Sequence, residues 1–189
     1  FLCAALASFL APHALADTLQ LSAVADNTLY DDGANGQLSN GQGIGIFSGA
    51  TNAGNIRRAL LRFDLTGIPP GATITGVSLR LRITQTIAGP ADTALYRMLS
   101  AWGEGASGGT GAGGSGAPAA DCDATWLHRY FPGATCTDTR WSTAGGDFAG
   151  LPSATAVAGN LGTTVVWGGP GLIADVQGMV DGTLANHGW

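Results

Sequence analysis

The chain of 189 residues has the length of one all-β domain. With 31 glycines, 45% hydrophobic residues and only 11% charged residues, it is unlike a highly charged disordered chain and is typical of short strands joined by tight turns. The net charge of −5 argues against a nucleic-acid partner, because such a surface must neutralise phosphates with cations.

The first residues predict an export signal. Residues 1–10 are almost wholly apolar, and Ala14-Leu15-Ala16 has the small-x-small pattern of a signal-peptide cleavage site. An apolar run of about eleven residues falls short of the roughly 20 that a membrane-spanning helix needs. We therefore predict a signal-peptide remnant over residues 1–16, a mature chain from Asp17, no membrane span, and a secreted or cell-surface protein.

Alternating apolar residues predict strands through the first half of the chain. Leu19, Leu21 and Ala23 alternate, and Ile44 and Ile46 alternate around glycines. The strongest pattern covers residues 57–83, where two alternating runs flank Pro69-Pro70-Gly71. Because proline favours a turn, we predict two adjacent antiparallel strands joined at this point.

Each of these two strands has one apolar face and one face with arginines. In the first, Ala59, Leu61, Phe63 and Leu65 alternate with Arg58, Leu60, Arg62 and Asp64. In the second, Val77, Leu79, Leu81 and Ile83 alternate with Ser78, Arg80 and Arg82. We therefore predict a sheet with a buried apolar face and a charged face in solvent.

The second half of the chain repeats the strand pattern and ends in a helix. Further strands are predicted over residues 93–99, 154–158 and 163–167. Leu172, Val176, Met179 and Val180 have helical spacing, and Gly182 predicts the end of that helix. The predicted fold is all-β: an antiparallel β-sandwich of jelly-roll type with one short helix near the C-terminus, over residues 17–189.

A Gly/Ala/Ser-rich segment, residues 103–120, is predicted to be a flexible loop. It is followed by Cys122 and Cys136, which in an exported protein favour a disulfide. The alternative is a zinc site that includes His128, but a fourth ligand at recognised spacing is not evident.

Catalysis is not indicated. A glycosidase needs two carboxylates across the scissile bond, and the chain has one glutamate, Glu104, with no aspartate singled out as its partner. His128 and His187 likewise have no partner visible in the sequence. We predict a protein that is not an enzyme.

A calcium ion is the one cofactor that the sequence suggests. Asp31, Gly33 and Asn35 belong to a fragment of the calcium-loop pattern, with Gln42 where the pattern requires glutamate. Asp175 is a further candidate ligand, as are Asp121, Asp123 and Asp147. The alternative for residues 31–36 is a tight turn without a metal.

Arginines and aromatic residues point to a glycan as the ligand. Guanidinium groups bind carboxylates with two hydrogen bonds, and aromatic rings offer stacking surfaces. The predicted ligand-binding residues are Arg62, Arg80, Arg82, Arg97, Trp126, Tyr130 and Trp141. The alternative is an idle solvated face, with the arginines paired to residues such as Asp64 and the tryptophans in the core.

Several segments together resemble the DNRLRE-type domain, in the order of that family. They are Arg58–Leu65 with Ile68–Ile74, Asp123–His128, Trp141–Phe148, Ala174–Gln177 and Asn186–Trp189. The resemblance implies a secreted bacterial or archaeal β-sandwich similar to alginate-binding modules, without a catalytic centre. The family continues into a final apolar strand after the position of Trp189, so the resemblance also implies an unpaired strand edge in residues 17–189.

The predicted function is that of a secreted, non-catalytic module that binds an extracellular polysaccharide, an acidic one if the arginines contact it. The alternative is a structural or adhesive domain of the cell surface or matrix, without a soluble ligand. A hydrolytic enzyme of unrecognised mechanism is the weakest of the three hypotheses.

Overall fold

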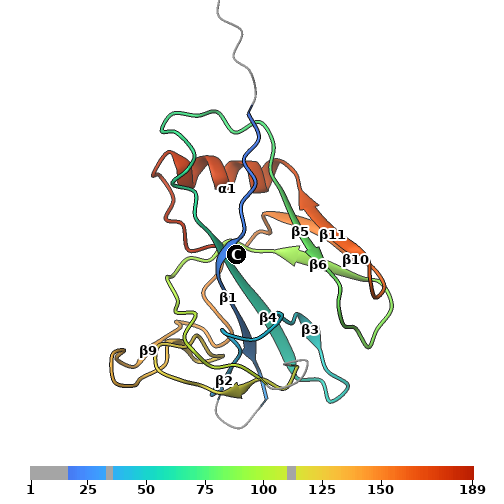
Figure 1. Ribbon diagram of the computed structural model, residues 1–189, viewed down its shortest axis with the longest axis vertical. Helices are drawn as coiled ribbons and strands as arrows, with labels where there is room; N and C mark the ends of the chain where they lie inside the picture. Colours follow the sequence, from blue (N-terminus) through green and yellow to red (C-terminus); the bar gives the residue numbers. More distant parts are fainter. Residues whose placement is uncertain (1–16, 33–35, 110–113) are drawn as a thin grey trace, which may run out of the picture.

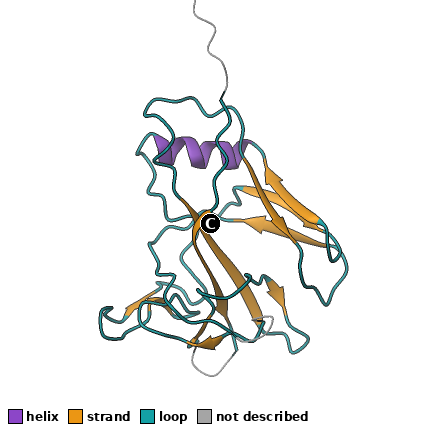
Figure 2. Cartoon of the chain, viewed as in Figure 1, coloured by secondary structure: helices purple, strands orange, loops and turns teal. Residues whose placement is uncertain are grey.

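Short antiparallel strands and one helix make up the regular structure of this computed structural model, which describes residues 17–32, 36–109 and 114–189 (Figure 1). The predicted signal segment, residues 1–16, lies outside the described residues. Figure 2 shows strands distributed through the molecule and a helix at one end. No helix in the described part of the chain combines the length and apolarity that crossing a bilayer requires.

The strands belong to small separate sheets, and every pairing is antiparallel. The largest sheet has the order β1 (Ala23–Tyr30), β4 (Ile56–Phe63), β3 (Gly49–Ala50). The others are β10 (Ala154–Ala158) with β6 (Ala91–Leu95), β11 (Thr164–Gly168) with β5 (Ser78–Arg82), β2 (Leu38–Ser39) with β7 (Ala117–Pro118), and β8 (His128–Tyr130) with β9 (Thr139–Arg140). The predicted antiparallel, strand-rich class is therefore confirmed, while none of these sheets closes on itself in the described residues.

The predicted pairing of the two arginine-bearing strands is wrong. β4 pairs with β1 and β3, whereas β5 pairs with β11, so residues 64–77 carry the chain from one sheet to another. The apolar alternation of β5 is confirmed, with Leu79 buried and Arg80 and Arg82 exposed. Period-2 patterning determines which side chains share a face, but it does not choose the neighbouring strand.

Two early strand predictions also fail. β1 begins at Ala23, after most of the predicted segment, and Ile44 lies 88% exposed outside any strand. β1 has no clean apolar alternation because Asn27 and Thr28 are buried in it. The Asn27 amide oxygen accepts hydrogen bonds from the Thr28 N–H, the Ser39 hydroxyl and the Asn40 N–H, which compensates for its burial.

In the first core cluster, the helix packs against strands from several of the sheets. Helix α1 (Pro170–Val180) buries Leu172, Val176 and Met179, as its spacing predicts. These side chains pack with Val165, Trp167 and other residues from β4, β5, β6, β10, β11 and the C-terminus. Gly182, with a φ of 71°, ends the helix and donates its N–H to the Met179 carbonyl oxygen at 3.3 Å.

The second core cluster lies on the other face of β4. Leu61 belongs to the first cluster, but its neighbour Leu60 packs with Leu29, Met98, Trp102 and Trp141 in the second. The face of β4 predicted to be charged and solvated is therefore covered by the loops that carry Trp102 and Trp141. β4 therefore has a buried residue on each face, Leu60 on one and Leu61 on the other, which its alternating sequence does not reveal.

The Gly-rich segment is anchored at both of its described ends. The Gly103 N–H donates to the Arg129 carbonyl oxygen at 3.0 Å, and β7 at the far end pairs with β2. A side chain at Gly105, whose φ is 72°, would collide with the buried Asp123 carboxylate. Residues 110–113, at the centre of the segment, lie outside the described residues.

The C-terminal residues pair with β4. The Leu61 N–H donates to the Trp189 carbonyl oxygen at 2.7 Å, and the Trp189 N–H donates to the Leu61 carbonyl oxygen at 2.8 Å. One edge of β4 is therefore occupied by Trp189 at Leu61.

Candidate functional site

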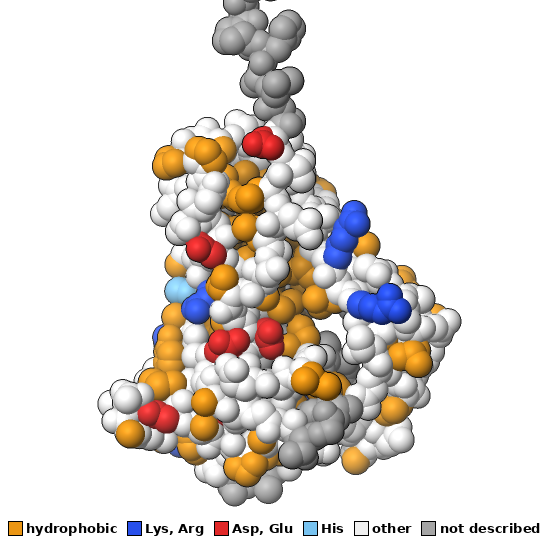
Figure 3. Space-filling view, viewed as in Figure 1, with side chains coloured by type: hydrophobic (Ala, Val, Ile, Leu, Met, Phe, Trp, Pro, Cys, Tyr) orange, Lys and Arg blue, Asp and Glu red, His pale blue; other side chains and the backbone are white. Residues whose placement is uncertain are grey.

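The predicted ligand-binding arginines do not share one face. Arg80 and Arg82 stand on the exposed face of β5, opposite Val166 and Thr164 of β11. Arg62 lies elsewhere, over the ring of Trp102 in the second core cluster, and Arg97 pairs with Asp175 of α1. In the space-filling view, cationic side chains at the right flank stand apart from those beside a histidine at the left edge (Figure 3).

Arg62 and Arg97 belong to what we call the basic cluster, formed by Arg62, Arg97, Arg129 and His187. The Arg62 guanidinium lies 5.6 Å from the centre of the Trp102 ring, and the Trp102 Nε1–H donates to the His187 carbonyl oxygen at 2.8 Å. Arg129 is held next to them, because its Nε–H donates to the Ala101 carbonyl oxygen at 2.8 Å. The buried Trp102 thus connects Arg62 with the backbone of His187, and its neighbour Ala101 holds Arg129.

The charges of all three arginines of the basic cluster act on His187. Burial lowers the pKa of His187, and the charges of Arg129, Arg62 and Arg97 lower it further. Among the described residues, Arg97 is the one arginine of the cluster with a carboxylate partner, Asp175 at 3.1 Å. The basic cluster therefore has unmatched positive charge in a protein of net charge −5.

Asp175, predicted as a calcium ligand, is engaged by protein groups. One of its oxygens accepts from Arg97 and the other from the Ser153 hydroxyl, which in turn accepts from Trp189 Nε1 at 3.1 Å. Of the other predicted calcium ligands, Gly33 and Asn35 lie outside the described residues. Asp31 follows β1 and donates its N–H to the Ile56 carbonyl oxygen at 3.0 Å. The calcium site stays a prediction.

The three further candidate aspartates accept hydrogen bonds from neighbouring loops. Asp121 accepts from the Thr135 hydroxyl and from the N–H groups of Thr135 and Cys136, and these bonds lower its pKa. Buried Asp123 accepts from the Ala120 N–H at 2.6 Å. The predicted disulfide between Cys122 and Cys136 is formed, with Cα atoms 5.2 Å apart. Its sulfur atoms are thereby unavailable to a zinc ion, although they lie close to Asp121.

The predicted aromatic residues have different roles. Trp141 is 6% exposed and donates its Nε1–H to the Thr125 carbonyl oxygen, so it is a core residue and not a stacking surface. Tyr130 is half-buried, with the Arg129 guanidinium 6.0 Å from its ring centre. Trp126 lies beneath Arg58, which the sequence analysis did not select.

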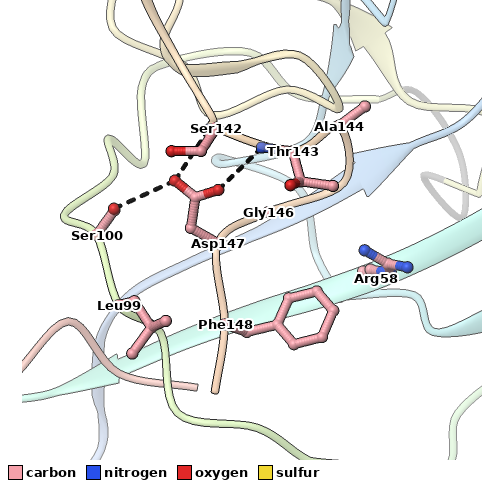
Figure 4. A pocket seen from close by; sticks show the side chains of 9 residues that line it. All are labelled: Arg58, Leu99, Ser100, Ser142, Thr143, Ala144, Gly146, Asp147 and Phe148. Atoms are coloured by element: carbon pink, nitrogen blue, oxygen red, sulfur yellow. Dashed lines mark hydrogen bonds between the residues drawn. The ribbon is translucent and has the colours of Figure 1, made fainter. Parts of the chain in front are cut away.

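Arg58 lines a pocket of about 460 Å³, which we call the Arg58 pocket (Figure 4). Its guanidinium carbon lies 4.9 Å from the centre of the Trp126 ring and 5.0 Å from that of Phe148. Its Nη1–H donates to the Gly145 carbonyl oxygen at 2.7 Å. The other lining residues are Leu99, Ser100, Ser142, Thr143, Ala144, Gly146, Asp147 and Phe148.

Asp147 is the carboxylate of the Arg58 pocket. Its burial acts to raise the pKa, but hydrogen bonds from the Ser142 and Thr143 N–H groups and the Ser100 hydroxyl outweigh burial and leave the pKa below its ordinary value. Figure 4 shows these three donors gathered around the carboxylate, with the Phe148 ring between Asp147 and Arg58. Asp147 is therefore ionised at neutral pH.

The structure also brings together two carboxylates that the sequence analysis did not pair, Asp26 and Glu104. The Asp26 N–H donates to Glu104 Oε1 at 3.1 Å, and burial followed by the Glu104 charge raises the pKa of Asp26. Neither residue lines the Arg58 pocket. His128 is buried, with Nδ1 2.9 Å from the Thr125 hydroxyl and Nε2 3.4 Å from Asp138.

Arg58, Arg129 and His187 were not among the predicted ligand-binding residues. Arg129 and His187 are brought near Arg62 by segments distant in sequence, which no local pattern reveals. One signal was present, because Arg58 and Arg62 occupy the same face of one strand. Comparison with family models, with curated proteins and with solved structures found no match for the chain. The resemblance to the DNRLRE-type domain therefore stays a prediction.

Proposed function

We propose that this protein is a secreted, non-catalytic module that binds an extracellular acidic polysaccharide. One observation carries the proposal: Arg58 and Arg62 are held against aromatic rings on the same side of β4, and neither forms an ion pair among the described residues. A guanidinium positioned by ring faces keeps hydrogen-bond donors available for an incoming carboxylate.

The spacing of these two arginines suits a polymer. They are four residues apart in β4, which corresponds to roughly 13 Å along a strand. Residues 97–100 run between their surroundings, with Arg97 in the basic cluster and Leu99 and Ser100 in the Arg58 pocket. Four of the eight arginines thus belong to the Arg58 pocket or to the basic cluster, although the net charge is −5.

Two further properties support an exported, non-catalytic role. A disulfide is expected of a protein that matures in an oxidising compartment. The Arg58 pocket contains one carboxylate, Asp147, whereas glycoside hydrolysis needs two across the bond. The proposal keeps the jelly-roll sandwich as its expected architecture, which the antiparallel pairing supports.

The test is retention on immobilised polyuronate, with dextran as the neutral control polymer. We expect the wild-type protein to be retarded on polyuronate and not on dextran. The double variant Arg58→Gln/Arg62→Gln should lose this retention, while Arg80→Gln/Arg82→Gln, which removes the same charge from exposed β5, should keep most of it. Equal loss in both variants would show that net charge alone governs retention, and absence of wild-type retention would refute the proposal.

The second candidate function is a structural or adhesive role at the cell surface. Apolar Val157 and Val166 are 60% and 47% exposed on neighbouring strands β10 and β11, so a contact between copies through this face is the feature that favours it. Sedimentation over a range of concentrations tests it: self-association that Val157→Ser/Val166→Ser abolishes would support the structural role.

A further inference from the structure

We propose that the Arg58 pocket binds a single hexuronate unit, with Arg58 taking the carboxylate, Phe148 packing against the sugar, and Asp147 and Thr143 binding its hydroxyl groups. This inference rests on the proposed function and assigns to one pocket the recognition of one sugar unit. The pocket volume of about 460 Å³ is within the range of small-molecule sites.

The hydrogen bonds of Arg58 leave room for a carboxylate. One N–H of its guanidinium donates to Gly145, and no carboxylate of the described residues lies within ion-pair distance. Asp31 acts on Arg58 only through longer-range charge, which opposes the effect of burial on its pKa. Because the rings of Trp126 and Phe148 fix the plane of the guanidinium, its remaining donors are oriented before a ligand arrives.

Asp147 limits the kind of anion that fits. Its carboxylate stays charged, and it would repel a densely charged sulfate or phosphate polymer in the same pocket. It accepts hydrogen bonds from hydroxyl groups instead. A cation and an anion in one pocket thus favour a ligand with one carboxylate and several hydroxyl groups, which describes a uronic acid.

The surface around Arg58 and Asp147 also suits a sugar, because it has apolar side chains and an exposed hydroxyl. Leu99 is 50% exposed at the rim, and the Phe148 ring lies between Asp147 and Arg58 in Figure 4. The C–H face of a sugar ring packs on such apolar surface while its edge makes hydrogen bonds. Thr143 is exposed, and its hydroxyl forms no hydrogen bond within the described residues, so it is open to a sugar hydroxyl.

The experiment titrates the ¹⁵N-labelled protein with trigalacturonate, with its methyl ester and with free glutamate. We expect trigalacturonate to shift the amide signals of residues 142–148. The methyl ester, which keeps the sugar and removes the charge, should bind at least tenfold more weakly to the wild type. In Arg58→Gln the two ligands should bind alike, because the group that distinguishes them is gone.

A surface variant keeps the test valid if Arg58→Gln unfolds. Leu99→Glu places a negative charge at the exposed rim and should weaken trigalacturonate binding at least tenfold. Leu99→Gln is the matched uncharged variant: it removes the same apolar contact without adding a charge, so it should weaken binding clearly less than Leu99→Glu does. Equal weakening in the two variants would overturn the assignment of an anionic ligand to this pocket.

The outcomes separate this inference from the proposed function. Retention on polyuronate without shifts at residues 142–148, or with Arg58→Gln unchanged toward both ligands, overturns the pocket assignment and leaves the function standing. Shifts by trigalacturonate without retention on the polymer support the pocket and refute the wider function. Tighter binding of glutamate than of trigalacturonate overturns the uronate assignment in favour of a zwitterionic ligand.

Discussion

Strands β4 and β5 have the same alternation of arginine and apolar residues and lie in opposite environments. On β5, Arg80 and Arg82 are exposed, and only the opposite face is buried. On β4, Arg58 and Arg62 lie against Trp126, Phe148 and Trp102, and Leu60 between them is 2% exposed. The same pattern thus gives a solvated face on one strand and two positioned cations on the other, because long loops cover β4 alone.

The first prediction concerns stability and has the largest expected effect. Trp102→Ala removes a side chain that is 1% exposed and should lower the free energy of unfolding by about 3–5 kcal/mol. Val166→Ala, on the β5 side, should change it by less than about 0.5 kcal/mol. Chemical denaturation measures both changes in the free energy of unfolding. Similar losses in the two variants would mean that the loops over β4 do not form a packed core.

The second prediction concerns the disulfide, which closes a loop packed over β4. Cys122→Ser/Cys136→Ser opens a loop of 14 residues that includes Trp126 and Arg129. We expect a loss of about 3 kcal/mol in the free energy of unfolding in the chain-entropy account. Amide signals should shift near Arg58 and the basic cluster and stay constant on β5. Equal shifts on β5 would contradict the view that these loops cover β4 and not β5.

The third prediction compares single arginines. Arg62→Gln should weaken polyuronate binding about tenfold, equivalent to about 1.4 kcal/mol, and cost up to about 1 kcal/mol of stability through the lost contact with Trp102. Arg80→Gln removes the same charge and should leave both quantities nearly unchanged. Calorimetric titration at matched ionic strength and thermal denaturation provide the two readings, and a larger effect at Arg80 would place the site on β5.

The fourth and smallest effect is a pH dependence at His187, which faces Arg62, Arg97 and Arg129, with Asp175 paired to Arg97. Its lowered pKa means that the unfolded chain takes up the proton first as the pH falls. The stability that this group contributes is therefore complete above its ordinary pKa, about 6.5, and is lost on acidification below it.

A bound polyanion favours protonated His187, so its affinity should rise by a few-fold between pH 7.5 and pH 5. His187→Asn should flatten this dependence and leave that of Arg80→Gln unchanged. Binding titrations at constant ionic strength decide this, and an equally steep rise in His187→Asn would assign the effect to another group.

Some elements of secondary structure were predicted from the sequence, and others were not. β10 spans residues 154–158 as predicted, β11 is displaced by one residue, and α1 buries three of the four residues whose spacing identified it. These elements are governed by local periodicity, and a glycine ends each of them or follows within two residues. β1 escaped prediction because Asn27 and Thr28 are buried in it, and only the contact of Asn27 with Ser39 and Asn40 makes that burial favourable.

Part of the candidate site was likewise predictable from the sequence, and part was not. The sequence predicted the disulfide, which the structure contains, and it placed Arg62 among the candidate ligand-binding residues, where it stays a prediction. It assigned Trp141 to a stacking role that burial rules out, and it omitted Arg58 and His187. Residues 58 and 145 are distant along the chain, so no local pattern relates them, although a hydrogen bond joins them in the fold.

By itself the sequence determined the antiparallel strand-rich class, the alternation of β5, the helix and the cysteine pair, because each depends on residues close together or on a single covalent bond. The tertiary structure decided which strands pair, which face of β4 is covered and which arginines converge. Those outcomes depend on where loops from residues 97–102 and 122–148 pack, and packing between distant segments is set by the whole chain.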